Sequence, residues 1–102
     1  AALTVEEEIL LRANRAATLL ALRRYQECIV DCDAALVLRQ GEEQVVSKLH
    51  HRREKATEAL ANADAAKKHG QEALARKDFA SAIEAFGEAL QHVDTGEGGK
   101  AF

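Results

Sequence analysis

The sequence predicts an all-α protein in which antiparallel helical hairpins are joined by a long helix. The chain of 102 residues contains no proline and few β-branched residues, and both features favour helix over strand. Positions of segment 16–36 are also matched by positions 54 residues later, which indicates an internal repeat of small and large side chains. The matched pairs are Ala16 and Gly70, Leu20 and Leu74, Tyr25 and Phe79, Cys28 and Ala82, Cys32 and Phe86, Ala35 and Ala89, and Leu36 and Leu90.

Composition limits the classes of function. The net charge of −3 gives no general basis for binding nucleic acid or an anionic membrane surface. No apolar run approaches the roughly 18 residues of a transmembrane helix, and no signal-peptide pattern is present. With its two cysteines, the chain fits a reducing compartment, so we expect a cytoplasmic protein. We expect one domain, residues 1–94, followed by a flexible, glycine-containing tail, residues 95–102.

The first predicted hairpin is the repeat of residues 6–39. Thr4 and Glu7 form a capping-box pattern, so the first helix begins there and runs to about Leu22. The second helix follows over residues 25–39, and Gly41 is its predicted stop. The positions predicted to be buried are Leu10, Ala13, Ala17 and Leu20 in the first helix and Ile29, Cys32, Ala35 and Leu36 in the second.

A long connecting helix is predicted over residues 42–76, because no turn signal interrupts that stretch. The alternative is two helices with a break near residues 62–64. A continuous helix would carry one apolar seam, which Arg53 and Lys67 interrupt. The seam consists of Leu49, Ala56, Leu60, Ala63, Gly70 and Leu74.

The second predicted hairpin covers residues 63–94. It combines the end of the long helix with a last helix over residues 79–93, for which Asp78 is the predicted N-cap. Because Ala16 and Gly70 occupy equivalent places, we expect both to be close-contact positions between the helices of their hairpins.

These residues resemble the tetratricopeptide repeat family, whose helical hairpins stack into an α-α superhelix. The resemblance covers about two-thirds of the chain, although the family period is about 34 residues and a proline commonly ends each repeat. It implies a protein-binding adaptor, similar to the tetratricopeptide domains of co-chaperones. The residues that match the family pattern are Asn14-Arg15-Ala16, Tyr25, Asp31 and Ala35-Leu36, then Gly70, Asp78-Phe79, Ala82-Ile83, Phe86 and Ala89-Leu90.

The resemblance also implies a peptide-binding site. Some domains of this family grip a C-terminal carboxylate with Asn and Lys or Arg side chains, and the matching residues here are Asn14, Lys48, Arg52 and Lys67. The implied partner is a peptide or protein tail, such as the acidic C-terminus of a heat-shock chaperone. The match is incomplete, because Gln71 replaces an Asn and the repeats stand in the wrong order for one clamp.

Lys48 and Arg52 also have a simpler interpretation, as a solvated face paired with nearby glutamates such as Glu43, Glu54 or Glu58. A second functional hypothesis is a scaffold that self-associates into a homo-oligomer through Leu49, Leu60 and Leu74.

Catalytic and metal-binding patterns are weak throughout the sequence. Cys28 and Cys32 lie one helical turn apart at packing positions, so we expect them in the core rather than on a metal. Adjacent His50 and His51 diverge on a helix, and the GEGGK segment lacks the spacing of a phosphate loop. We therefore expect no enzymatic activity, no metal and no cofactor.

Overall fold

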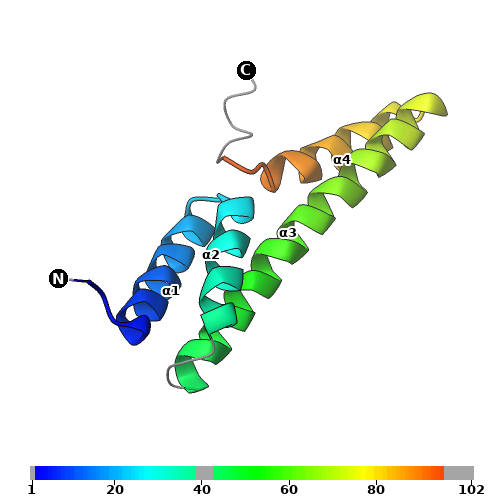
Figure 1. Ribbon diagram of the computed structural model, residues 1–102. Coiled ribbons are helices and arrows are strands. Elements are labelled where there is room, and N and C mark those ends of the chain that lie inside the picture. Colours follow the sequence, from blue (N-terminus) through cyan, green and yellow to red (C-terminus); the bar gives the residue numbers. More distant parts are fainter. Residues whose placement is uncertain (1, 39–42, 96–102) are drawn as a thin grey trace. The chain divides into compact units, whose positions relative to one another are not determined.

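The computed structural model describes residues 2–38 and 43–95, and within these ranges all regular structure is helical (Figure 1). The predicted all-α class is confirmed. The described residues form two compact units. The first contains the chain up to Thr57 together with Asp94 and Thr95, and the second is Glu58–Val93.

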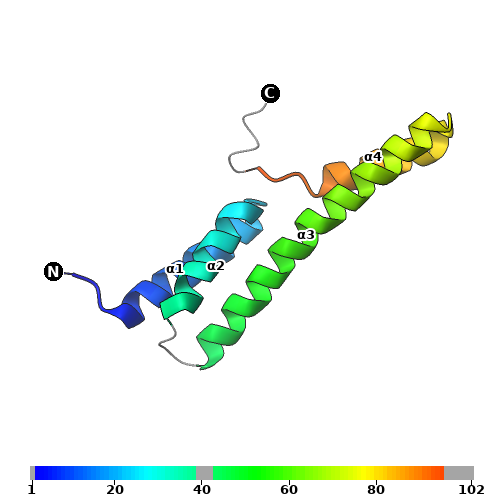
Figure 2. The ribbon, with the colours of Figure 1, turned by 45° about the vertical axis from the view of Figure 1, so that its right-hand side comes forward.

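The first unit contains a hairpin of helices α1 (Val5–Ala21) and α2 (Tyr25–Leu38). The beginning of helix α3 lies beside this hairpin in both views (Figures 1 and 2). The predicted capping box is confirmed, because the Glu7 N–H donates to Thr4 Oγ1 at 3.2 Å and the Thr4 N–H donates to Glu7 Oε1 at 3.0 Å. Thr95 adds a bond at the α1–α2 corner, where its N–H donates to the Arg23 carbonyl at 2.8 Å.

Helix α3 (Glu43–Ala75) is continuous, so the predicted long helix has no break near residues 62–64. Its second half forms the second unit with helix α4 (Phe79–Gln91). Asp78 is the N-cap of α4, as predicted, and its Oδ1 accepts from the Ser81 N–H at 3.3 Å. The predicted stop at Gly41, the end of the second helix at Arg39 and the tail over residues 96–102 lie outside the described residues.

The two helix corners have the same backbone geometry, 54 residues apart. Arg23 and Lys77 both adopt positive φ, at 60° and 62°. In each corner, the N–H of the following residue donates to a carbonyl in the last turns of the preceding helix. The Arg24 N–H donates to the Leu19 carbonyl at 2.8 Å, and the Asp78 N–H donates to the Ala73 carbonyl at 2.9 Å. This pattern is a Schellman motif with a residue other than glycine in the left-handed position.

Most of the buried positions of α1 lie one residue before the predicted ones. Ala13 is buried as expected, but Leu10 is exposed, and Ala17 and Leu20 are only half-buried. The reason is that α1 has runs of adjacent apolar residues, so spacing alone does not determine which of them faces the core. In α2, Cys32 and Ala35 are buried as predicted, whereas Ile29 and Leu36 are half-buried. The buried residues of the two helices are Ile9, Ala13, Ala16, Leu19, Tyr25, Cys28, Asp31, Cys32 and Ala35.

The predicted seam of α3 is correct only in part. Leu49, Ala56 and Gly70 are buried, but Leu60 and Ala63 are half-buried and Leu74 is half exposed. Near the end of α3 the buried positions are instead Ala66, Gly70 and Ala73, which follow helical spacing. Leu74 lies about 100° further round the helix than Ala73, which places it outside this buried face.

The predicted close contact is confirmed at Gly70, and Ala16 is buried. Ala16 is completely buried in the first hairpin. In the second unit, Gly70 of α3 lies directly against the ring of Phe86 on α4, since a Cβ added at Gly70 would lie 2.5 Å from Phe86 Cε1. Small residues at these positions therefore allow the helices of each hairpin to approach.

Candidate functional site

Arg52 links α3 to α1 within the first unit. Its Nη1 donates to the carbonyl of Ala13 at 2.7 Å, and Ala13 immediately precedes Asn14 in α1. On the other side, the Cys28 thiol contacts the Arg52 carbonyl at 4.0 Å. The guanidinium of Arg52 is thus held beside the backbone of α1 at Ala13, next to Asn14.

Asn14 and Lys48 are both exposed in the first unit. The backbone carbonyl of Asn14 accepts from the Thr18 hydroxyl at 3.1 Å, a bond that does not use the Asn14 side-chain amide. Lys48 lies one helical turn before Arg52 on α3 and makes no ion pair with any described residue. Three of the four predicted site residues, Asn14, Lys48 and Arg52, thus belong to the first unit.

Two further cations of α3 have other positions or partners. Lys67 is exposed on the part of α3 that belongs to the second unit. Arg53, which follows Arg52, is paired with α2, because its Nε lies 2.5 Å from Asp33 Oδ1. No described glutamate forms an ion pair with Lys48 or Arg52, so the structure gives no pairing with Glu43, Glu54 or Glu58.

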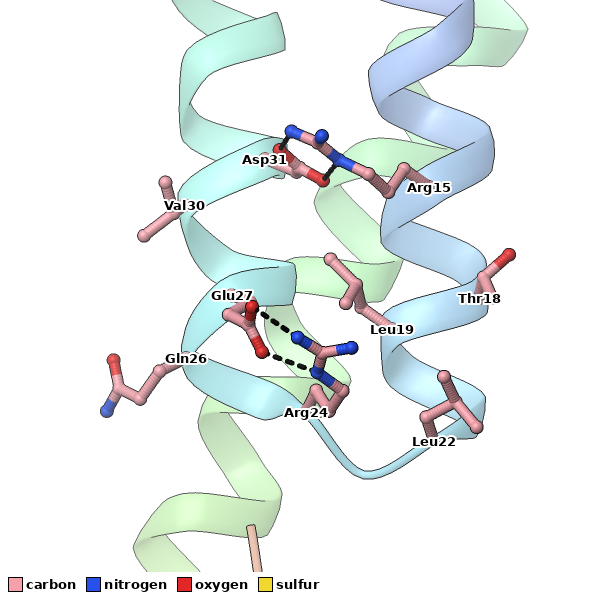
Figure 3. A pocket seen from close by; sticks show the side chains of 9 residues that line it. All are labelled: Arg15, Thr18, Leu19, Leu22, Arg24, Gln26, Glu27, Val30 and Asp31. Atoms are coloured by element: carbon pink, nitrogen blue, oxygen red, sulfur yellow. Dashed lines mark hydrogen bonds and ion pairs between the residues drawn. The ribbon is translucent and has the colours of Figure 1, made fainter. Parts of the chain in front are cut away.

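The α1–α2 hairpin also carries a hollow of about 590 Å³ that the sequence did not predict (Figure 3). Two arginine–carboxylate pairs frame it. Arg15 Nε and Nη2 each donate to Asp31 at 2.6 Å, and Arg24 Nε and Nη2 donate to Glu27 at 2.6 and 2.7 Å. The hollow is lined by Arg15, Thr18, Leu19, Leu22, Arg24, Gln26, Glu27, Val30 and Asp31.

Asp31 is the only charged residue that is fully buried among the described residues, with 2% of its surface exposed. It accepts from Arg15 twice and from Arg12 Nη1 at 3.3 Å. Its hydrogen bonds and negative charge raise the pKa of Arg15. The sequence did contain a signal for this site, since a carboxylate lies between the packing positions Cys28 and Cys32 on one helix and needs a cationic partner.

The chemistry of the hollow favours an apolar ligand group. Both guanidinium groups already have bidentate carboxylate partners, so an incoming anion would have to displace one of them. Leu22 and Val30, in contrast, are more than half exposed at its edge. The hollow can accept an aliphatic or aromatic side chain, whereas the Asn14, Lys48 and Arg52 surface can accept an anion.

Cys28 and Cys32 are free and completely buried, which confirms their predicted place in the core. The contact with Cys28, together with burial, raises the pKa of Cys32, so this thiol stays neutral. Within the described part of the chain, no group of three or more His, Cys, Asp or Glu side chains could hold a metal ion. None of the described helices combines the length and apolar character needed to cross a membrane.

Comparison of the chain with protein-family models, curated proteins and solved structures gave no match.

Proposed function

We propose that the chain is a protein-interaction module that binds the C-terminal carboxylate of a peptide or protein tail. The observation that carries this proposal is the Arg52–Ala13 bond, which holds a guanidinium beside Asn14 while Lys48 lies one turn away. A guanidinium has five N–H donors, so the bond to Ala13 leaves donors for a ligand. Lys48 adds a second cation and the Asn14 amide a neutral donor, which together suit a carboxylate.

The resemblance to tetratricopeptide domains makes this proposal more specific. It favours an adaptor or co-chaperone-like role in the cytoplasm, with the acidic C-terminus of a heat-shock chaperone as the ligand. Because Asn14 and Lys48 are exposed, affinity should fall as salt concentration rises.

Fluorescence anisotropy with a labelled acidic peptide tests the proposal. The peptide is titrated with a free C-terminus and with an amidated one, and only the free form should bind tightly. Lys48→Ala should cost about 1–2 kcal/mol of binding free energy, since it removes a charge-assisted hydrogen bond. Lys68→Ala removes an equal charge from an exposed position of α3 and serves as the control. Equal affinity of the two peptides would reject the carboxylate site.

Arg52 needs a separate design because it also stabilises the first unit. Arg52→Ala removes the bond to Ala13 as well as the cation. Arg52→Lys keeps the charge but loses the planar fork that binds a carboxylate through two parallel bonds. We expect Arg52→Lys to weaken binding while the far-UV spectrum stays helical, and unchanged affinity would exclude Arg52 from the site.

The second candidate function is a self-associating scaffold. The observation that favours it is the large exposed apolar side chains on the helices, among them Leu74 and Phe79. Leu49 is covered within the single chain, so a seam between chains is limited to Leu60 and Leu74. Sedimentation velocity at high micromolar concentration tests this function, because Leu60→Glu should disperse an oligomer and a monomeric wild-type chain would exclude it.

A further inference from the structure

The N-terminus of helix α2 is capped from a distant part of the chain. Arg24 precedes α2, and its carbonyl accepts from the Cys28 N–H at 3.0 Å, so Arg24 holds the N-cap position. Its guanidinium has no acceptor atom for the N–H groups of the first turn. The Gln26 N–H instead donates to Asp94 Oδ2 at 3.2 Å. In the second hairpin the equivalent of Arg24 is Asp78, which caps α4 with its own side chain, so Asp94 supplies to α2 the cap that Arg24 cannot.

Thr95 ties the same part of the chain to the α1–α2 corner. Its N–H donates to the Arg23 carbonyl at 2.8 Å, and its hydroxyl donates to the Leu22 carbonyl. Leu22 and Gln26, whose backbones make these contacts with Thr95 and its neighbour, both line the hollow of the first hairpin. Figure 3 shows them at one end of the hollow, with Arg15 at the other. The chain that follows Thr95 therefore begins at the edge of the hollow.

The residues after Thr95 include an apolar group that suits this hollow. Segment 96–102, GEGGKAF, has three glycines and one aromatic residue, Phe102. Leu22 and Val30 are more than half exposed at the hollow, and both of its arginines already have carboxylate partners. An aromatic ring can cover these apolar side chains without separating an ion pair, and burial of its apolar surface favours the contact.

The length of the segment permits the contact. Along α1 the hollow extends from Leu22 to Arg15, which is roughly 10 Å at 1.5 Å per residue. The seven residues after Thr95 can span up to about 23 Å, so Phe102 can reach any part of the hollow. A segment tethered at this edge has an effective concentration on the order of millimolar. A partner protein or a second copy would have to reach that concentration in solution, so the tether favours the chain's own segment.

We propose that the hollow of the α1–α2 hairpin binds Phe102 of the same chain, and that Asp94 and Thr95 are the anchor that presents segment 96–102 to it. The hollow shares no lining residue with the proposed carboxylate site, so the two sites are separate. Segment 96–102 is then an internal competitor, because any partner that offers an apolar side chain to the hollow has to displace Phe102.

Phe102→Trp tests the proposal in the full chain, which otherwise contains no tryptophan. Docking should shield the indole from the quencher acrylamide. Adding Val30→Glu places a charge in the hollow and should raise the quenching constant about threefold, as expected if about two-thirds of the chains are docked. Val37→Glu is the matched control, because Val37 is 76% exposed on α2, lies outside the hollow and receives the same charge. Far-UV circular dichroism checks that each variant stays helical.

Several results would overturn the proposal. Equal quenching with and without Val30→Glu would mean that the ring does not lie in the hollow, and an equal rise in Val37→Glu would place it elsewhere. Asp94→Ala should also raise the quenching constant, because it removes the anchor, and no change would contradict the tether. Shielding that increases with protein concentration would mean that the segment of a second copy occupies the hollow.

Discussion

The two hairpins have the same corner and different surroundings. Arg23 and Lys77 take up the same left-handed conformation, and Ala16 and Gly70 are the small residues at the equivalent contacts. Yet Tyr25 is buried and its counterpart Phe79 is mostly exposed. A repeated sequence thus specifies the hairpin, whereas the neighbouring helix decides which of its large side chains are covered.

The hairpins also differ in what holds their helices together. The first contains Asp31, which accepts hydrogen bonds from two arginines of α1. Its counterpart in α4 is Ala85, which can make no such bond. In the second hairpin the Phe86 ring lies against Gly70, where the first has Cys32 and Ala16. The first hairpin combines a buried ionic cluster with small apolar groups, and the second combines a close aromatic contact with the buried alanines Ala66, Ala73 and Ala82.

Truncating the α3 side chain that is buried in the first unit should have the largest effect on stability. Leu49 is 1% exposed, so Leu49→Ala should lower the free energy of unfolding by about 2–5 kcal/mol. Leu74→Ala, on the same helix but half exposed, should cost less than about 1.5 kcal/mol. Urea unfolding followed by far-UV circular dichroism measures both variants, because Leu49 lies in the first unit and Leu74 in the second. Similar losses in both variants would contradict the difference in cover.

The Gly70–Phe86 contact should produce the next largest effect. Gly70→Ala should lower stability by about 1–3 kcal/mol although alanine is the better helix former, because its Cβ would overlap the Phe86 ring. Gly87→Ala on α4 is the control, since a Cβ there meets no atom within 4 Å, and it should raise stability by about 0.5–1 kcal/mol. Circular dichroism during thermal unfolding measures both. Stabilisation by Gly70→Ala would show that the helices do not approach so closely.

The Asp31 cluster should rank third. Asp31→Asn removes a charge that accepts three hydrogen bonds, but both arginines can reach water, so we expect a loss of about 1–2 kcal/mol. Asp33→Asn changes a carboxylate on the same helix whose pair with Arg53 is largely exposed, and should cost at most about 1 kcal/mol. Equal effects on the urea unfolding midpoint would mean that burial adds nothing to the Asp31 cluster.

The fold could be predicted from local signals, and the surfaces could not. The capping box of Thr4, the N-cap Asp78 and the repeat positions depend on neighbours within a few residues, so the sequence contains them directly. The exposure of Leu74 depends on which neighbour lies against α3 at that point, and spacing within one helix carries no such information.

The candidate site shows the same limit. Asn14, Lys48 and Arg52 were predicted as donors, and the structure places them in one unit. The Arg52–Ala13 bond joins residues far apart in the sequence, and so does the hollow beside Asp31. No local sequence pattern predicts either of them.

The two left-handed corner residues allow a smaller, symmetric test. A side chain in this conformation costs about 1–2 kcal/mol, while glycine loses about 0.5–1 kcal/mol through the freedom of the unfolded chain. Arg23→Gly and Lys77→Gly should therefore each raise stability by up to about 1 kcal/mol. Arg76→Gly is the control and should lower it, since φ is not positive there. Opposite signs for Arg23→Gly and Lys77→Gly would mean that the corners are not equivalent.

The smallest effect is a pH dependence shared by the two hairpins. Hydrogen bonds with Thr4 lower the pKa of Glu7 below its ordinary 4.5, and bonds with Ser81 lower the pKa of Asp78 below 3.8. Because the unfolded chain binds these protons more readily, the stability from each cap is present above those values and is lost as pH falls through the folded pKa. Thr4→Val and Asp78→Asn should each make the unfolding midpoint depend less on pH below about pH 5. Glu43→Gln, at the first residue of α3 and outside both caps, is the control. A slope that survives both cap changes would place the acid sensitivity elsewhere.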